Sequence, residues 1–421
     1  MNYQETIQYL YDSVPMFQRV GASAYKSGLE NTYALDEHFE HPHRKFHTIH
    51  VAGTNGKGSV SHTLAAILQT AGYKVGLYTS PHLLDFRERI RINGEKISEK
   101  YVINFVAQEK AFFEPLYPSF FELTTAMAFK YFAEQSVDVA VIEVGLGGRL
   151  DCTNIIQPDL SIITNISLEH TQFLGDTLAK IASEKAGIIK PGIPVVIGET
   201  TPETKSVFLQ KAREMNAPIF FAEENGREDF PGISPELRGI YQQMNKQTIV
   251  TALTVLRDLG YRFDGPMVRY GFGHVTSLTG LMGRWQTLQE HPTLLCDTGH
   301  NVGGFQYIGE QLKALRKELH IVIGVVSDKD VHGMLSFLPQ NATYYFTKAS
   351  VKRALNEQEL QCVAAECGLQ GDTYPDVVSA VKAAQKNCLP EEVIFVGGSN
   401  FIVADLLASC DALNLDQRVL R

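Results

Sequence analysis

The chain lacks an excess of positive charge, long apolar segments and paired cysteines. Its 421 residues carry a formal net charge of −9. A nucleic-acid binder needs a basic face to contact the phosphate backbone, so this composition argues against that class. No apolar run approaches the roughly eighteen residues that span a bilayer. We therefore expect neither a nucleic-acid partner nor a membrane partner.

The longest basic cluster consists of Arg87, Arg89 and Arg91 in the segment FRERIRI. Their period of two places all three arginines on one side of a strand, since successive side chains of a strand point to opposite faces. We interpret them as the solvated face of that strand.

The six cysteines are scattered, with no C-x-x-C pair and no pairing typical of a metal site; they occur at positions 152, 296, 362, 367, 388 and 410. In a chain of this length, the pattern predicts reduced thiols rather than a disulfide framework. The N-terminal segment contains acidic residues and no positive region followed by an apolar one, so it predicts a surface helix rather than a signal peptide. These features together predict a cytoplasmic protein.

The order of predicted elements favours an α/β fold with two domains. A chain of this length is long enough for two separate cores. Apolar strands alternate with helices, which predicts a doubly wound, P-loop NTPase-like domain over residues 1–275. A glycine-rich hinge is predicted at 276–292 and a smaller Rossmann-like domain at 293–421. The second domain has no G-x-G-x-x-G fingerprint, so a dinucleotide is not implied.

Residues 46–72 have the pattern of a buried strand, a glycine-rich turn and a helix. Residues 46–52 are largely apolar and β-branched, and from Ser59 the apolar residues recur at helical spacing. The turn therefore lies at a helix N-terminus, where unpaired backbone N–H groups and the helix dipole favour a phosphate. Lys57 adds a positive charge there. The phosphate-binding candidates are Gly53, Thr54, Asn55, Gly56, Lys57, Gly58 and Ser59.

This loop is not a strict Walker A motif, which would have a glycine in place of Val51 and a hydroxyl in place of Gly58. An ordinary glycine-rich turn between strand and helix is the alternative interpretation. A lysine in this context favours the phosphate site.

Two polar residues near the ends of apolar strands suggest a divalent-cation site. Glu143 lies near the end of the apolar run 137–144, and an acid is costly inside a strand unless it binds a cation or a strong donor. Ser80 follows the strand 74–79, at the carboxyl edge where such sheets bind ligands, and its hydroxyl could reach Mg²⁺. A salt-bridged structural glutamate and a plain turn serine are the alternatives.

Two further residues with candidate chemistry are His170 and Lys185. His170 follows the strand 159–166, although a lone histidine is more often structural than a ligand. Lys185 lies in an apolar helix, where burial would lower its pKa and leave a neutral amine able to take up CO₂. An exposed helix lysine is the alternative.

The segment GTNGKGS is similar to the variant P-loop of the Mur ligase superfamily, and with its flanks it resembles the folylpolyglutamate synthase and dihydrofolate synthase branch, of the bacterial bifunctional type. The segments TSPH, FELT, SLEHTQFLG and SEKAGI match the family's motifs in the same order. Two departures are Cys152, where the family pattern has alanine, and DTGHN, where it has D-G-A-H-N.

The resemblance implies specific roles for these residues. Ser80, Glu143 and His170 would bind two Mg²⁺ ions, with a monovalent cation as a further option. Lys57 and His170 would be catalytic, together with Lys185 as a carbamate. Asn245 would contact adenine, and Arg284 and Asp297 of the second domain would contact ATP.

The resemblance also places three segments beside the pterin-bearing substrate, although residues 27–30 could be a simple connector and the aromatic residues near 121 could be core. The segment with Ser27 continues into the first of the substrate candidates, which are Gly28, Leu29, Glu30, Phe121, Glu122, Leu123, Thr124, Asp151, Cys152 and Thr153.

The activity implied is ATP-dependent addition of L-glutamate to dihydropteroate and to reduced folates by a monomeric ligase, through an acyl phosphate. A monofunctional folylpolyglutamate synthase is the nearest alternative. A muropeptide ligase would have a UDP-binding domain before the loop, and only 52 residues precede Gly53. A non-catalytic nucleotide-binding module would retain the loop without Glu143 and His170.

Overall fold

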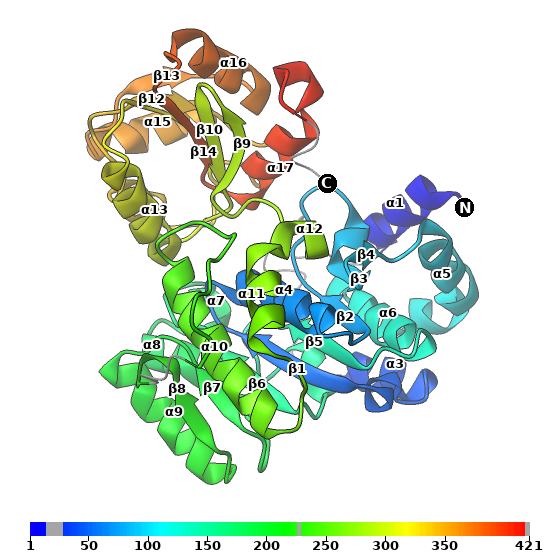
Figure 1. The fold of residues 1–421 in the computed structure, drawn as a ribbon. Coiled ribbons are helices and arrows are strands. Elements are labelled where there is room, and N and C mark those ends of the chain that lie inside the picture. The colour runs from blue at the N-terminus through cyan, green and yellow to red at the C-terminus, as the bar shows by residue number, and fades with distance from the viewer. Residues whose placement is uncertain (14–27, 225–228, 417–421) are drawn as a thin grey trace. The chain divides into compact units, whose positions relative to one another are not determined.

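The computed structural model describes residues 1–13, 28–224 and 229–416, drawn in Figure 1. The chain divides into two compact units. The first comprises Met1–Glu236 and Gln243–Thr279, and the second comprises Leu237–Gln242 and Gly280–Arg421. None of the described helices is long and apolar enough to cross a membrane.

The first unit contains an eight-stranded sheet with the order β4-β3-β2-β5-β1-β6-β7-β8. Six strands are parallel, and β3 and β4 extend one edge in antiparallel pairing. The strands are β1 (His47–Ala52), β2 (Val75–Tyr78), β3 (Ile90–Ile92), β4 (Glu95–Lys96), β5 (Val139–Glu143), β6 (Leu160–Ile163), β7 (Val195–Ile197) and β8 (Ile219–Phe221). Every residue of β5 and of β6 is buried, as expected for parallel strands covered on both faces.

Helices cover both faces of this sheet. They are α1 (Tyr3–Ser13), α3 (Glu30–His38), α4 (Lys57–Thr70), α5 (Glu99–Phe113), α6 (Phe120–Glu134), α7 (Thr171–Leu174), α8 (Leu178–Ala186), α9 (Pro202–Glu214), α10 (Gln242–Asp258), α11 (Gly265–Gly273) and α12 (Val275–Thr279). Strand β5 shows the layering: Val139 and Val141 pack with α4 and α10, whereas Ala140 and Ile142 pack with α5 and α6. Side chains of a strand alternate between faces, so one apolar strand contributes to two cores.

The second unit contains a six-stranded sheet with the order β13-β12-β11-β14-β10-β9, in which only the edge strand β9 is antiparallel among the described pairings. Its strands are β9 (Gln286–Glu290), β10 (Thr293–Asp297), β11 (Leu319–Ile323), β12 (Thr343–Phe346), β13 (Gly371–Thr373) and β14 (Val393–Gly397). Its helices are α13 (Val302–Ala314), α14 (Val331–Leu335), α15 (Glu357–Glu366), α16 (Val377–Asn387) and α17 (Asn400–Ala408). The α/β fold class expected from the sequence is confirmed.

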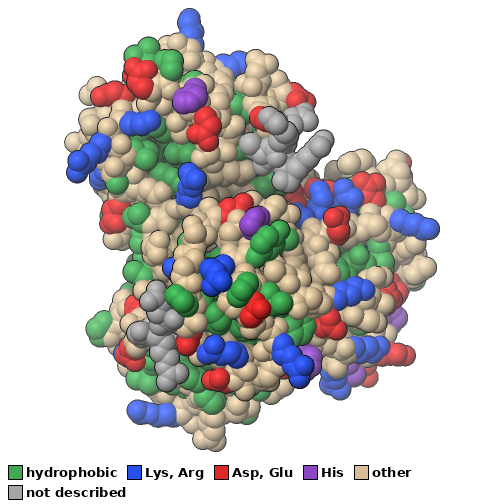
Figure 2. All heavy atoms as spheres, viewed as in Figure 1, with side chains coloured by type: hydrophobic (Ala, Val, Ile, Leu, Met, Phe, Trp, Pro, Cys, Tyr) green, Lys and Arg blue, Asp and Glu red, His purple; other side chains and the backbone are tan. Residues whose placement is uncertain are grey.

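The interpretation of the arginine cluster as a solvated strand face is wrong. Residues Phe86–Arg89 form a 3₁₀ helix, and only Ile90–Ile92 is strand. Arg89 and Arg91 are buried: Arg89 donates from Nε to His82 Nδ1 at 2.7 Å, and Arg91 donates to the carbonyl of Gly94 at 2.9 Å. Elsewhere, on the face drawn in Figure 2, basic and acidic side chains are interspersed rather than gathered by sign.

Candidate active site

The glycine-rich turn joins β1 to α4 at the carboxyl edge of the first sheet. Gly56 precedes the helix with φ 84°, and no side chain caps the helix N-terminus. Gly53 has φ 140°, and a Cβ there would lie 1.9 Å from Thr164 Oγ1. A Cβ on Gly56 would lie 2.4 Å from Asn245 Oδ1. Only glycine therefore fits either position. Asn245 lies against the turn, and its contact with adenine stays a prediction.

Residues that follow β6, the strand next to β1, bind the glycine-rich turn through hydrogen bonds. Thr164 Oγ1 donates to the carbonyl of Asn55, and Asn165 Oδ1 accepts from the amide of Asn55 at 2.9 Å. Thr54 Oγ1 accepts from the amide of Ser167 at 3.0 Å. These bonds fix the loop before any ligand arrives, so binding requires little ordering of the backbone.

Two lysines converge on the carbonyl of Gly53. Lys57 Nζ lies 3.0 Å from this oxygen and 3.0 Å from the carbonyl of Thr54, while Lys185 Nζ donates to the Gly53 carbonyl at 2.8 Å. Burial of Lys185, with the charge of Lys57 nearby, lowers the pKa of the Lys185 amine to about 7. Lys185 is 5% exposed, so the exposed-lysine alternative is wrong. The Lys185 amine is therefore partly unprotonated near pH 7.

Glu143 and Ser80 reach the same edge from two adjacent strands. Glu143 ends β5 opposite Val51 of β1, and its side chain is buried. The backbone amide of Ser80, which follows β2, donates to Glu143 Oε2 at 3.1 Å. A buried carboxylate beside a serine hydroxyl provides the oxygen donors that Mg²⁺ prefers, so these residues fit a divalent cation.

His170 lies at the start of α7 with a left-handed backbone, φ 51°. Its Nε2 is 4.0 Å from the carboxylate of Glu169, and its side chain is partly exposed. Glu169 is a site residue that the sequence reasoning missed: its side chain is largely buried, and its negative charge opposes the lowering of the Lys185 pKa. The sequence contained the signal for Glu169, because an acidic residue next to a candidate metal ligand is itself a candidate metal ligand.

A second missed residue is His50, in the middle of β1. Burial lowers its pKa to about 3, so the ring is neutral, and Nε2 lies 2.8 Å from Thr153 Oγ1. Thr153 in turn contacts Asp151, whose other carboxylate oxygen accepts from the amides of Gly145 and Leu146 at 3.0 and 2.8 Å. This buried network fixes the turn that follows Glu143.

The three predicted substrate segments lie in elements that pack together. Helix α3, which begins just after Gly28 and Leu29, packs against α6 and against the 3₁₀ helix Cys152–Ile155, and α6 also contacts that 3₁₀ helix. Ser27 lies outside the described residues. The segments therefore share one side of the first unit.

Individual residues of α6 have structural functions. Glu122 completes the N-terminal capping box of α6 with Ser119, and Leu123 is core. Thr124 Oγ1 lies 3.0 Å from the hydroxyl of buried Tyr78. Phe121 is only partly buried and lies against Gly145, where a Cβ would be 2.4 Å from its ring. Phe121 is thus the member of this segment best placed to contact a ligand.

In the second unit, Asp297 orders its own loop. Its carboxylate accepts from the amide of Trp285 at 2.8 Å, the hydroxyl of Tyr241 at 2.6 Å and the amide of Gly299 at 2.8 Å. Arg284 contacts Thr298 Oγ1 and donates to the carbonyl of Gly283 at 3.2 Å. The predicted ATP contacts of Arg284 and Asp297 stay predictions.

Comparison with known proteins identifies the family. Residues 51–233 match the Mur ligase middle domain, and residues 283–400 match the Mur ligase, glutamate ligase domain. The chain is 32% identical to the dihydrofolate synthase/folylpolyglutamate synthase of Bacillus subtilis (strain 168), over 90% of this chain and 94% of that protein. The chain belongs to the Mur ligase family, in its dihydrofolate synthase/folylpolyglutamate synthase branch. It is also 33% identical, over 96% of its length, to a probable bifunctional folylpolyglutamate synthase/dihydropteroate synthase of Haloferax volcanii, of which it spans only half.

Solved structures of this ligase branch match the fold over nearly the whole chain. E. coli FolC in complex with DHPP and ADP superposes with a TM-score of 0.86 at 30% identity, covering 98% of this chain and 99% of that one. A bifunctional folylpolyglutamate synthase/dihydrofolate synthase with Mn, AMPPNP and L-glutamate bound superposes with a TM-score of 0.85 at 30% identity, covering 98% of each. The family resemblance seen in the sequence is confirmed, whereas the roles of single residues stay predictions.

Proposed function

We propose that the chain is an ATP-dependent ligase that adds L-glutamate to dihydropteroate and to reduced folates. The observation that carries this proposal is the convergence of an uncapped helix N-terminus, Lys57, Lys185 and Glu143 at one sheet edge. The related structures with ADP, AMPPNP, Mn and L-glutamate support it.

The reaction needs an activated carboxylate, because a free carboxylate has a poor leaving group. A carboxylate oxygen of the folate substrate attacks the γ-phosphorus of ATP, ADP leaves, and an acyl phosphate forms. The amine of glutamate then attacks the acyl carbon, phosphate leaves, and the amide is complete. The N–H groups at the start of α4 and the ammonium of Lys57 hold the phosphates and spread their charge.

Ser80 and Glu143 would hold one divalent cation, and His170, with Glu169 near it, would hold a second. Such an ion would neutralise charge on the transferring phosphoryl group. Glu143 is positioned for this task by its pairing with β1, and Asp151 keeps the following turn in place.

Lys185 is suited to carbamate formation because its lowered pKa, about 7, leaves part of the amine unprotonated near pH 7. The amine nitrogen bonds to the carbon of CO₂ and releases one proton, which converts a buried base into an anion near the predicted cation site. Gly53 would then need a different partner for its carbonyl, and Lys57 is already within 3.0 Å of that oxygen.

A direct assay separates the two activities. Purified protein is supplied with ATP, Mg²⁺ and L-glutamate, and with either dihydropteroate or a reduced folate; ADP release and the amide product are measured. We expect product from both acceptors. Product from the reduced folate alone would assign the monofunctional alternative, and no acceptor-dependent ADP release would refute the proposal.

A matched pair of variants tests the site itself. Lys185→Ala should abolish turnover, whereas Lys180→Ala should not, since Lys180 lies on the same helix α8 with an exposed side chain paired to Asp176. Equal activity in the two variants would remove Lys185 from the mechanism.

A further inference from the structure

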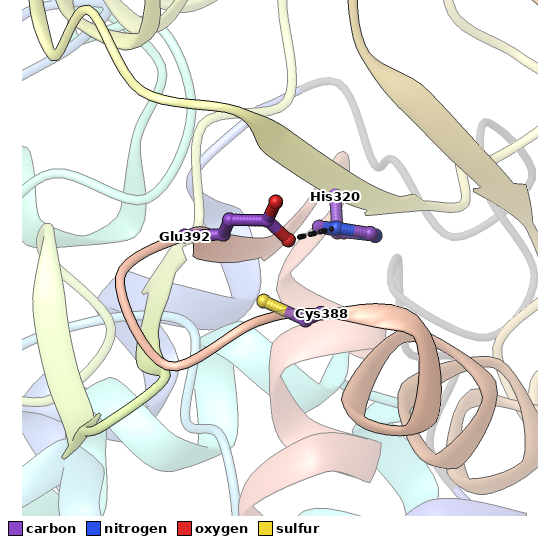
Figure 3. Close-up of side chains that lie close together, drawn as sticks. All are labelled: His320, Cys388 and Glu392. Carbon is purple, nitrogen blue, oxygen red and sulfur yellow. Dashed lines mark hydrogen bonds and ion pairs between the residues drawn. The ribbon is translucent and has the colours of Figure 1, made fainter.

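Three side chains able to bind a metal converge in the second unit, and none takes part in the proposed reaction. They are His320 of β11, Cys388 at the C-terminal end of α16, and Glu392 immediately before β14. One ligand atom from each lies within 4.8 Å of the other two. Figure 3 shows the contact between the imidazole of His320 and the carboxylate of Glu392, with the side chain of Cys388 near them.

The backbone around this cluster is held by regular structure. Strands β11 and β14 are paired, with Leu319 opposite Val393, so His320 lies opposite Ile394, two residues after Glu392. The amide of Cys388 continues the hydrogen bonding of α16, and Glu392 Oε2 accepts from the amide of Leu389 at 2.8 Å. The ligands are thus carried by two central strands and a helix end rather than by a long loop, which favours a defined geometry.

Hydrogen bonds at both ring nitrogens orient the imidazole of His320. Nδ1 lies 2.9 Å from the hydroxyl of Tyr345, which also accepts from Asn387 Nδ2 at 3.2 Å. Nε2 lies 3.0 Å from Glu392 Oε2. An imidazole that donates its Nε2–H to the carboxylate accounts for this distance, and a metal ion bound by both atoms would take the place of that proton. The histidine is therefore placed as metal-ligating histidines usually are, with its second nitrogen held by a polar partner.

We propose that His320 Nε2, Cys388 Sγ and the carboxylate of Glu392 bind one divalent transition-metal ion, for which Zn²⁺ is the best match. Zn²⁺ accepts nitrogen, sulfur and oxygen ligands together in a tetrahedron, whereas Mg²⁺ and Ca²⁺ prefer oxygen alone. Three protein ligands leave a fourth position for water, and the cluster is reachable because Cys388 is only partly buried.

The competing explanation is a His320–Glu392 ion pair that closes the turn, with the thiol of Cys388 hydrogen-bonded to Glu392 and no metal ion. Both explanations account for the 3.0 Å contact. They differ in whether the sulfur joins the coordination, and a thiolate-sensitive probe answers that question.

Co²⁺ is such a probe, because a bound thiolate gives it an intense charge-transfer absorption. The reduced full-length chain, freed of metal by a chelator, is titrated with Co²⁺ and then with Zn²⁺. We expect one equivalent to produce the thiolate band and Zn²⁺ to remove it. Cys388→Ser should lose the band, whereas Cys362→Ser, which changes an exposed cysteine of α15 in the same unit, should retain it. The predicted Mg²⁺ ligands in the first unit include no sulfur, so the band is independent of the proposed activity.

Tyr345→Phe tests the positioning of His320 with little change of shape. Loss of such an outer partner should weaken Co²⁺ binding about 10- to 100-fold while the band keeps its position. His320→Gln should weaken binding further. Absence of the band in the unchanged chain, its persistence in Cys388→Ser, or unaltered affinity in His320→Gln would each overturn the metal site in favour of the ion pair.

Discussion

The N-terminus of α4 in the first unit differs from three helix N-termini at the carboxyl edge of the second sheet. In the first unit, α4 begins at Gly56 without a side-chain cap. In the second unit, α13, α16 and α17 begin with caps from Asn301, Asp376 and Ser399, each of which accepts from a backbone amide of its own helix. The first backbone N–H groups of a helix have no partner within it. Each of these three helices of the second unit thus has a side-chain acceptor for one such group, whereas Gly56 supplies none to α4, and we propose that an anion takes that place.

The acidic residues at the ends of β10 and β5 also differ in their hydrogen-bond partners. Asp297 at the end of β10 accepts three hydrogen bonds from its own surroundings. Glu143 at the end of β5 accepts from Ser80 at a position flanked by the phosphate loop and by a second strand end. Among the hydrogen bonds described here, the acid at the end of β10 is bound by its own loop, whereas the acid at the end of β5 is bound by the residue that follows a neighbouring strand.

The largest expected effect comes from removing the positive charge of Lys57 at the N-terminus of α4. Lys57→Ala should lower kcat/KM for ATP-dependent glutamate addition by about 10²- to 10³-fold, because a charged donor to the transferring group is lost. The midpoint of thermal unfolding should change little, because Lys57 is only partly buried. The two hydrogen bonds that it donates to loop carbonyls are lost in the variant. Turnover near that of the unchanged chain would mean that the uncapped helix is not the phosphate site.

Filling the space beneath the loop should have the next largest effect. In Gly53→Ala the new Cβ meets Thr164, including its backbone nitrogen at 3.0 Å, so overpacking adds about 1–3 kcal/mol to the cost of a left-handed backbone. Gly72→Ala is the matched control, because Gly72 has φ 92° and nothing within 4 Å of a Cβ. Denaturant unfolding and ADP binding are measured for both variants. Equal losses would show that the loop tolerates a side chain.

Particular residues show how far the sequence could lead. The glycine loop, Glu143 and Ser80 were predictable, because local patterns placed them at strand ends and parallel strands bring their carboxyl ends to one edge. Arg89 was misinterpreted, because its burial depends on His82 and on the ring of Phe120, which periodicity does not show. His320, Cys388 and Glu392 were also out of reach. The histidine and the cysteine are 68 positions apart in the sequence, and the pairing of β11 with β14 and the packing of α16 on β11 bring them together.

The buried lysine gives a pH test of the first unit. Lys185 has a pKa of about 7 in the fold and an ordinary value of 10.5, so the unfolded chain binds more protons between these values. Stability should therefore rise with pH from about 7 to 10, by up to about 1.4 kcal/mol per pH unit from this group. In CO₂-free buffer, the stability difference between the chain and Lys185→Met should shrink over that window. A difference independent of pH would show that the amine is not desolvated.

The smallest expected effect is in the second unit, at a helix that is already capped. Asp376 accepts from the amide of Ser379 at 2.7 Å, and its removal in Asp376→Ala should cost about 1 kcal/mol of unfolding free energy, as loss of an N-cap usually does. Asp376→Asn keeps an acceptor oxygen and should retain most of the stability. Neither variant should alter ADP affinity, because this terminus already has its acceptor. If Asp376→Ala weakened ADP binding as Lys57→Ala is expected to, the proposed difference between the N-terminus of α4 and the capped N-terminus of α16 would be wrong.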